Sequence, residues 1–364
     1  MYSRTLSFYF ARHFARMVLS LFVLILFVAA LTTLMEFFNR GFKGDATLGW
    51  GLAILSLFRV PTAGEETLPF VVLYGSIAAF VLANRRLEVV VARAAGVSAW
   101  QFLVPATLVG LVFGVLATVL YNPIAADLLA RSNQMAAQVF VKKDKPVNPA
   151  ADQPVWMRQP GGGGDSIIGA VRSFDDGLGL GGVTAFVFAG DGVFRERVDA
   201  QTGHYAAGEW LLQDATVTAT GSSPRRVDTY HLPTDVSPTA IRRTFQQLES
   251  VSFWTLPAWA DAAHLAGVPS DRYDLQYQAL LARPILLLAM VLIAATVSLR
   301  FSRSRSLGPL IVTGVAVGFL LYVVIKIAKD LGSGGIVSPL LAAWLPALIA
   351  ILIGMTVLLH LEDG

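Results

Sequence analysis

The feature that most constrains this chain is a set of six long stretches that contain no charged residue. A helix needs roughly 20 mostly apolar residues to cross about 30 Å of hydrocarbon. The chain is 55% hydrophobic and only 15% charged, whereas soluble domains are about 45–50% apolar and about 25% charged. We therefore predict an integral membrane protein with six spanning helices. The stretches are Met17–Met35, Thr67–Asn84, Ala94–Ala126, Pro284–Leu299, Ser306–Ile325 and Leu331–Leu359.

Three details of these spans are open to more than one interpretation. The uncharged stretch 46–58 is too short to span, so it either lies in the membrane interface or begins the second span before Pro61 breaks the helix. Arg283, just before the fourth stretch, is expected to extend its charge to the membrane surface. A cleaved signal peptide is the alternative for the first stretch, but its apolar part exceeds the usual roughly 7–15 residues. We therefore favour a retained first helix.

The arginines of the short connections set the predicted orientation. Cytoplasmic loops carry an excess of Lys and Arg, and here every second connection is rich in arginine. This pattern predicts that both termini lie in the cytoplasm. The arginines are Arg4, Arg12, Arg16, Arg85, Arg86, Arg93, Arg300, Arg303 and Arg305.

The polar region between the third and fourth spans is predicted to form an external, all-β domain. Short runs rich in Val, Ile, Phe, Trp and Thr alternate there with Gly, Asp and Pro clusters, which is typical of a sandwich or jellyroll-like fold. Two helices, 256–266 and 271–282, are expected to follow. The predicted runs are Pro154–Arg158, Ser166–Ser173, Thr184–Ala189, Val193–Val198 and Glu209–Ala219.

These elements divide the chain into four predicted parts. Residues 1–126 hold membrane helices 1–3, with a cytoplasmic coupling helix at about 85–96. Residues 127–255 form the jellyroll-like domain, 256–279 a helical connector, and 280–364 membrane helices 4–6. The predicted fold is thus an α-helical membrane protein with six transmembrane helices and an external all-β, jellyroll-like domain inserted between helices 3 and 4.

Several chemistries are absent from the sequence. It has no P-loop, no H-E-x-x-H, no G-x-S-x-G and no cysteine, and its five histidines show no metal-ligand spacing. No carboxylate pair stands out within a span, which argues against a buried proton relay. We therefore expect a transport or scaffold component with no catalytic residues, no cofactor, no metal and no nucleic-acid partner.

The segment Arg85–Gly96 between spans two and three is short and amphipathic, and Gly96 can end a helix. Its arginines need no function beyond orienting the chain in the membrane. Glu88 is less easily explained in that way, because an acidic residue on a short cytoplasmic helix suits docking into a basic groove. The candidate docking residues are Arg86, Glu88, Arg93 and Gly96.

Asn84–Gly96, with the pattern R-x-L-E-V-V-x-x-x-A-x-G, resembles the coupling segment of the LptF/LptG family of lipopolysaccharide export permeases. The resemblance extends over essentially the whole chain, and the later motifs are more similar to LptG than to LptF. Those motifs are Ser252–Pro257 after the β domain, Leu281–Pro284 at span four, Gly318–Val323 in span five and Ala342–Pro346 in span six.

The resemblance implies one half of a heterodimeric ABC transporter in the inner membrane of a Gram-negative bacterium. The implied partners are an LptF-like permease, a dimer of the LptB-like ATPase, and LptC- and LptA-like periplasmic proteins. ATP and Mg²⁺ would bind the ATPase, and lipopolysaccharide and membrane lipid would contact this chain. Glu88 and its neighbours would then transmit ATP-driven closure.

Lipid A combines acyl chains with anionic phosphates, so its cavity needs apolar walls and cations near the outer membrane face. Four cations lie at the predicted external ends of spans one and five, where the positive-inside rule does not place them. Simple attraction to lipid headgroups is the alternative. Glu36, an acidic residue near the end of span one, departs from the family's pattern. It either pairs with Arg40, four residues later on the same helix face, or contacts substrate. The cations are Arg40, Lys43, Lys326 and Lys329.

Four aromatic residues of the β domain are candidates for a path that carries acyl chains. Phe186 and Phe188 share one strand face by alternation, and Trp156 and Trp210 are the other two. An ordinary β core is the alternative explanation for all four.

Two other functions remain open. A lipoprotein-releasing or other lipid ABC exporter typically has four spans with its external domain after the first, which differs from the arrangement predicted here. A non-transporting membrane assembly protein would have no ATPase partner and would tolerate changes at Glu88.

Overall fold

The fold is described from a computed structural model, which covers residues 4–41, 46–94, 96, 98–140, 155–161, 164–174, 177–238, 241, 248–265, 270–300 and 308–363. Contacts divide the chain into two compact units, which we describe separately. The helical unit comprises Met1–Leu129, Val251–His264 and Pro269–Gly364. The sheet unit comprises Ala130–Ser250 and Leu265–Val268.

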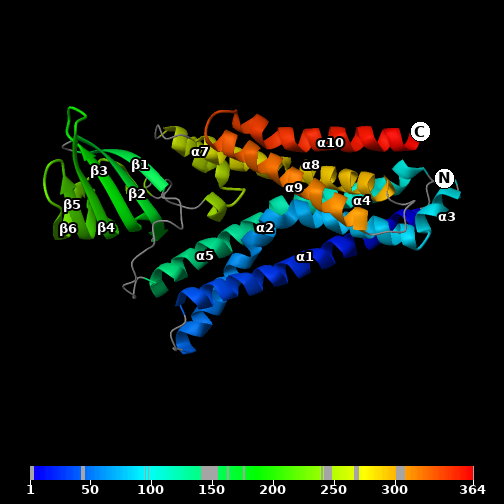
Figure 1. The fold of residues 1–364 in the computed structure, drawn as a ribbon, viewed down its shortest axis with the longest axis horizontal. Coiled ribbons are helices and arrows are strands. Elements are labelled where there is room, and N and C mark those ends of the chain that lie inside the picture. The colour runs from blue at the N-terminus through cyan, green and yellow to red at the C-terminus, as the bar shows by residue number, and fades with distance from the viewer. Residues whose placement is uncertain are drawn as a thin grey trace. The chain divides into compact units, whose positions relative to one another are not determined.

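Six helices of the described residues are long and apolar enough to cross a membrane, as the sequence predicts. The third is composite, because a five-residue π-helical turn, η1 (Ala117–Tyr121), joins α4 to α5. Figure 1 shows the long helices of the unit. The helices are α1 (Arg4–Gly41), α2 (Ala46–Arg85), α4 (Ala99–Leu116) with α5 (Asn122–Phe140), α8 (Asp271–Arg300), α9 (Gly308–Ser333) and α10 (Pro339–Asp363).

The prediction that Pro61 breaks the second helix is wrong. Helix α2 runs without interruption from Ala46 to Arg85 and contains both Pro61 and Pro69. Membrane helices tolerate proline because neighbouring helices satisfy or shield the freed backbone groups. Here α2 packs along α1 and α8, and this tertiary packing outweighs the local cost of proline.

Helix α8 is the centre of the helical unit. In its most apolar stretch 67% of the residues are buried, compared with 11% in α1 and 17% in α9. The core contains Phe14, Phe80, Leu287 and Val291. Helices α1 and α9 therefore present most of their apolar surface outwards.

A pair of glycines brings α4 close to α8. Gly110 and Gly114 are four residues apart, and a Cβ atom at Gly114 would lie 2.5 Å from the Cα atom of Pro284. At Gly110 an added Cβ would lie 2.7 Å from the side chain of Val291. Small residues at this spacing let membrane helices approach to backbone contact, so the α4–α8 packing depends on both glycines.

The two chain termini and the short helix α3 (Glu88–Ala94) lie at the same end of the helical unit (Figure 1). An even number of spans requires this arrangement. The C-terminal ends of α1 and α9 lie at the opposite end (Figure 1).

The sheet unit is built on one six-stranded antiparallel sheet in which every strand pairs with its neighbour in sequence. An all-β domain inserted between the third and fourth membrane helices is therefore confirmed, and its described strands form a meander. The strands are β1 (Val155–Gly161), β2 (Gly164–Phe174), β3 (Gly179–Phe188), β4 (Phe194–Ala206), β5 (Glu209–Ala219) and β6 (Arg225–Pro233).

The sequence does not predict β6, because most of its residues are polar and exposed, as befits an edge strand. Tyr230 anchors this strand by donating a hydrogen bond from its hydroxyl to Glu196 Oε1 on β4, at 2.7 Å. Burial and this hydrogen bond raise the pKa of Tyr230, so the hydroxyl stays protonated at neutral pH.

Two helices follow the sheet, as predicted. Helix α7 spans Leu256–Leu265, and α8 begins at Asp271 and continues into the fourth membrane span. The connector and this span are thus one continuous helix from Asp271 onward.

Candidate functional site

The helical unit contains a buried ion pair between Glu65 of α2 and Arg283 of α8. Arg283 Nη1 lies 2.6 Å from Glu65 Oε1, and their side chains are only 15% and 8% exposed. Glu65 lies 20 residues from Arg85, about 30 Å along the helix, so the pair sits far from the end that carries the termini. The sequence leads us to expect Arg283 to extend its charge to the membrane surface; the structure shows this charge paired with Glu65 inside the protein.

Asn122 connects this ion pair to the segment that precedes α7. Its Nδ2 atom donates to Glu65 Oε1 at 2.7 Å, and its Oδ1 atom accepts the backbone N–H of Phe253 at 2.8 Å. Both Asn122 and Phe253 are buried, and the Phe253 ring stacks on Tyr277 of α8 at 5.5 Å. We call Glu65, Asn122, Phe253 and Arg283 the buried polar cluster.

The π-helical turn adds three more connections next to the buried polar cluster. The Thr118 hydroxyl donates to the Leu280 carbonyl at 2.9 Å, and the Tyr121 hydroxyl donates to the Pro61 carbonyl at 2.9 Å. Trp254 Nε1 donates to the Val119 carbonyl at 3.3 Å. The wider turn thus joins α2, α8 and the 251–255 segment to the third membrane helix.

Sequence reasoning missed this cluster for an identifiable reason. It began the second span after Glu65, so the carboxylate fell outside the membrane segments. Two opposite charges could have indicated the cluster: Glu65, which lies inside the 40-residue helix α2, and Arg283, which lies just before span four. An isolated charge in a span needs a partner, so each could have been matched with the other.

Glu88, the candidate docking residue, is held by the first helix. The Tyr9 hydroxyl donates to Glu88 Oε1 at 3.0 Å, and Arg86 Nη1 lies 3.9 Å from the same oxygen. The His13 ring stacks against Tyr9 at 6.3 Å. Glu88 Oε2 is buried without a hydrogen-bond partner among the described residues, and the Glu88 side chain as a whole is 21% exposed.

The coupling segment also presents an apolar surface that the sequence analysis did not select. Leu87 and Val91 are 60% and 66% exposed, while Val89 is buried. Leu87 has a φ of 59°, and Gly96 has a φ of 83°, which is the left-handed geometry expected after a helix end. Arg86 is exposed at 55% of its side chain, and the side chain of Arg93 lies outside the described residues.

The candidate substrate cations are only partly described. Lys326 and Lys329 lie on α9, close to its C-terminal end, and both are exposed. Glu36 is exposed near the end of α1, whereas the Arg40 side chain and Lys43 lie outside the described residues. Helix α1 packs on α2 and α4, whereas α9 packs on α10, α8 and α2. The two groups thus belong to different parts of the helical unit.

Three of the four candidate aromatics share one face of the sheet. The Trp156 ring stacks on Phe186 at 5.8 Å, and both Phe186 and Phe188 contact Phe194. Trp156 remains 46% exposed. Phe194 extends this set, which we call the aromatic face, and no sequence pattern distinguishes Phe194 from other aromatic residues.

Trp210 lies on the other face of the sheet and is fully buried. Its Nε1 donates to Gln159 Oε1 at 3.2 Å, and its ring packs edge-on against Tyr205. It belongs to the same core as Met157 and Ala185. Met157 directly follows Trp156 and Ala185 directly precedes Phe186, so both point to the face opposite the aromatic face. Trp210 is therefore a core residue, and the lipid path proposed below leaves it out.

Comparison with known proteins adds one finding. A family model described as the lipopolysaccharide export system permease LptF/LptG matches residues 8–360. No curated protein matches the chain significantly. The matched region includes all six membrane helices and all six strands.

Replacing Arg283 should destabilise the protein strongly, because the variant Arg283→Met leaves Glu65 buried without its charge partner. Breaking a buried pair in this way costs roughly 3–5 kcal/mol of unfolding free energy. The measurement is thermal unfolding in detergent, with Arg272→Met, at an exposed position of the same helix, as the control.

The double variant Glu65→Gln/Arg283→Met should recover much of that loss, because it removes both charges and keeps an acceptor for Asn122. An Arg283→Met protein as stable as Arg272→Met would show that the ion pair does not hold the helices together.

Proposed function

The chain belongs to the LptF/LptG family of lipopolysaccharide export permeases, and we propose that it is the LptG-like half of a heterodimeric ABC permease. Such a permease extracts lipopolysaccharide from the inner membrane of a Gram-negative bacterium and passes it to a periplasmic bridge. The family match over residues 8–360, which spans the membrane helices and the inserted sheet alike, carries the permease part of the proposal. The choice of LptG over LptF rests on the similarity of the later sequence motifs alone. The chain itself is a transport component and not an enzyme.

The proposed topology places both termini and α3 in the cytoplasm and the sheet unit in the periplasm. Two observations support it. The termini and α3 share one end of the helical unit (Figure 1), and the arginines of the short connections fall at that end in the sequence.

The proposed partners are an LptF-like permease, an LptB-like ATPase dimer, and LptC- and LptA-like periplasmic proteins. ATP and Mg²⁺ would bind the ATPase, because this sequence has no nucleotide-binding motif. The outward-facing apolar surfaces of α1 and α9 support a second permease, since together they offer walls for a shared cavity.

The coupling segment would dock the ATPase through two kinds of contact. The exposed side chains of Leu87 and Val91 suit an apolar pocket, and the partly exposed carboxylate of Glu88 suits a cationic donor. The Tyr9–Glu88 hydrogen bond ties the coupling segment to α1. A displacement of α3 would thereby move the cytoplasmic end of α1. Glu36 lies near the other end of this helix.

The substrate would enter the cavity with its phosphates toward the outer ends of α1 and α9. Lys326 and Lys329 are exposed there on α9, and Arg40 and Lys43 would supply further positive charge from the end of α1. Glu36 would either pair with Arg40 or contact a substrate group. In the sheet unit, the acyl chains would follow the aromatic face formed by Trp156, Phe186, Phe188 and Phe194.

The insertion of the sheet between the third and fourth membrane helices favours this proposal over a lipoprotein-releasing exporter, whose external domain typically follows the first span. A non-transporting assembly protein would leave the Tyr9–Glu88 contact and the outer cations without a role. Both alternatives predict an outcome different from ours in the experiments below.

Reversing the charge of the α9 lysines should weaken lipopolysaccharide binding. A hydrogen bond to a charged group contributes roughly 1.5–3 kcal/mol, so Lys326→Glu or Lys329→Glu should reduce photocrosslinking to lipopolysaccharide about tenfold or more. Arg272→Glu, another exposed cation at the same end of the unit, is the matched control. Crosslinking at the wild-type level would mean that these lysines only contact lipid headgroups.

Loss of the Tyr9–Glu88 hydrogen bond should uncouple the ATPase from the membrane helices. Tyr9→Phe should leave the ATPase bound but lower the lipopolysaccharide released per ATP hydrolysed, whereas Glu88→Ala should also reduce ATPase recovery. The control is Tyr277→Phe, which keeps its ring stacked on Phe253. Unchanged ATPase recovery and unchanged transport in Glu88→Ala would refute the coupling role.

A further inference from the structure

His13 is a polar residue in an apolar wall of α1. It lies beside Phe10 and Phe14, whose rings contact Phe102 of α4 and Phe80 of α2. His13 is only 6% exposed, and its Nε2 atom is buried with no hydrogen-bond partner among the described residues. A buried polar atom without a partner is destabilising, so packing alone does not account for a histidine at this position.

Glu88 supplies a second buried atom without a partner, its Oε2. Both residues contact Tyr9, whose hydroxyl donates to Glu88 Oε1 at 3.0 Å and whose ring stacks on His13 at 6.3 Å. Tyr9 and His13 are four residues apart, so they lie on one face of α1. The Glu88 carboxylate also acts electrostatically on His13. A nitrogen and a carboxylate oxygen that both lack partners are thus held next to the same tyrosine.

The charges around His13 favour a hydrogen bond from the neutral ring. Besides Glu88, the guanidinium groups of Arg86 and Arg16 act electrostatically on it. A neutral imidazole with its proton on Nε2 can donate to a carboxylate without adding a third positive charge. The chemistry of the site therefore suits His13 as a donor and Glu88 as its acceptor.

The backbone directly before Glu88 is strained. Leu87 has a φ of 59°, a left-handed conformation that is costly for a residue with a Cβ atom. It joins the end of α2 to α3, whose first residue is Glu88. Such strain is typical of switch regions. A change of backbone conformation at Leu87 would turn Glu88 relative to α1.

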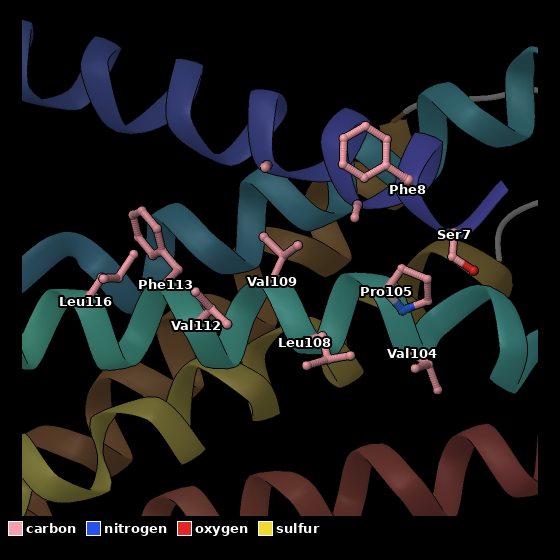
Figure 2. Close-up of a pocket in the computed structure, with 11 residues that line it drawn as sticks. Ser7, Phe8, Val104, Pro105, Leu108, Val109, Val112, Phe113 and Leu116 are labelled. Atoms are coloured by element: carbon pink, nitrogen blue, oxygen red, sulfur yellow. The ribbon is translucent and has the colours of Figure 1, made fainter. Parts of the chain in front are cut away.

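The same part of α1 has space on its other side. An apolar groove of about 610 Å³ lies between α1 and α4 (Figure 2). Its wall on α1 includes the small residues Ser7, Ala11 and Ala15, which alternate with Tyr9 and His13 in sequence. Close packing resists displacement, so this open space leaves the first turns of α1 room to shift relative to α4.

We propose that His13 is a positioning residue for the coupling carboxylate. When the ATPase moves α3, the segment turns at Leu87 and His13 Nε2 donates a hydrogen bond to Glu88 Oε2. Pairing these two buried atoms would stabilise the moved position of the coupling segment on α1. Tyr9 would hold Glu88 before the movement, and Tyr9 and His13 together would hold it afterwards. The inference rests on the coupling role given to Glu88 under the proposed function.

The test uses the complete complex of permease and ATPase in proteoliposomes. Two quantities are measured for each variant: the lipopolysaccharide released per ATP hydrolysed, and the unfolding temperature of the complex in detergent. His13→Phe keeps an aromatic ring beside Tyr9 but removes the donor. It should lower the release per ATP roughly tenfold, because a hydrogen bond to a carboxylate is lost. Its unfolding temperature should not fall, because Nε2 has no partner in the structure described.

Two further substitutions separate the donor from the shape of the ring. The amide nitrogen of Gln lies about as far from the backbone as Nε2, so His13→Gln should retain most of the transport. The amide of Asn reaches only as far as Nδ1, so His13→Asn should resemble His13→Phe. His360→Phe, at an exposed position on α10, is the matched control and should transport as the wild type does.

A double-mutant cycle tests whether His13 and Glu88 act through one bond. If they do, His13→Phe combined with Glu88→Gln should lose no more transport than the more damaging single variant. Losses that multiply would show that the two residues act independently, which would overturn the proposal.

Three other outcomes would contradict the inference. Wild-type transport in His13→Phe together with impaired Glu88→Ala would refute the role of His13 and leave the proposed function intact. Equal loss of transport and of unfolding temperature in all three His13 variants would mean that the residue only packs. Unchanged transport in Glu88→Ala would contradict the coupling function itself, and the inference with it.

Discussion

The ion pair between Glu65 and Arg283 is the interaction on which the arrangement of the helical unit depends. Two charges buried inside the protein need each other, because a buried charge without its partner is costly. Asn122 uses the same carboxylate and passes the connection to the backbone of Phe253. The cluster therefore lets the 251–255 segment pack among the helices and fixes α2, α5 and α8 to one another.

The two ends of the helical unit are built for different tasks. At the end with the termini, Tyr9 holds Glu88, and Leu87 and Val91 remain exposed. At the other end, the buried polar cluster joins three helices, while α1 and α9 keep their apolar surfaces outward. Helix α1 connects the coupling segment with the outer face and is little buried. A rigid core around α8 with a less constrained α1 is the arrangement that a coupled movement requires.

Hydropathy and charge made the six spans and the inserted β domain predictable, because each span has to satisfy the same length and polarity requirement. The sequence also placed Glu88 at the coupling segment, but its partner Tyr9 is 79 residues away, and no local pattern shows such a contact. Glu65 was missed because the second span was taken as the charge-free stretch that begins at Thr67, and Arg283 was given a surface role. Trp156 and Trp210 look alike in sequence, and only the register of the sheet puts one on the aromatic face and the other in the core.

The most direct measurement is a mild-detergent purification of the chain, followed by mass spectrometry of the bound proteins and lipids. A permease of the proposed kind should recover an ATPase, a second six-span permease and lipid A in one complex. Recovery of the chain alone with ordinary phospholipid, from a preparation shown to keep such complexes intact, would contradict the transport function and favour an assembly protein.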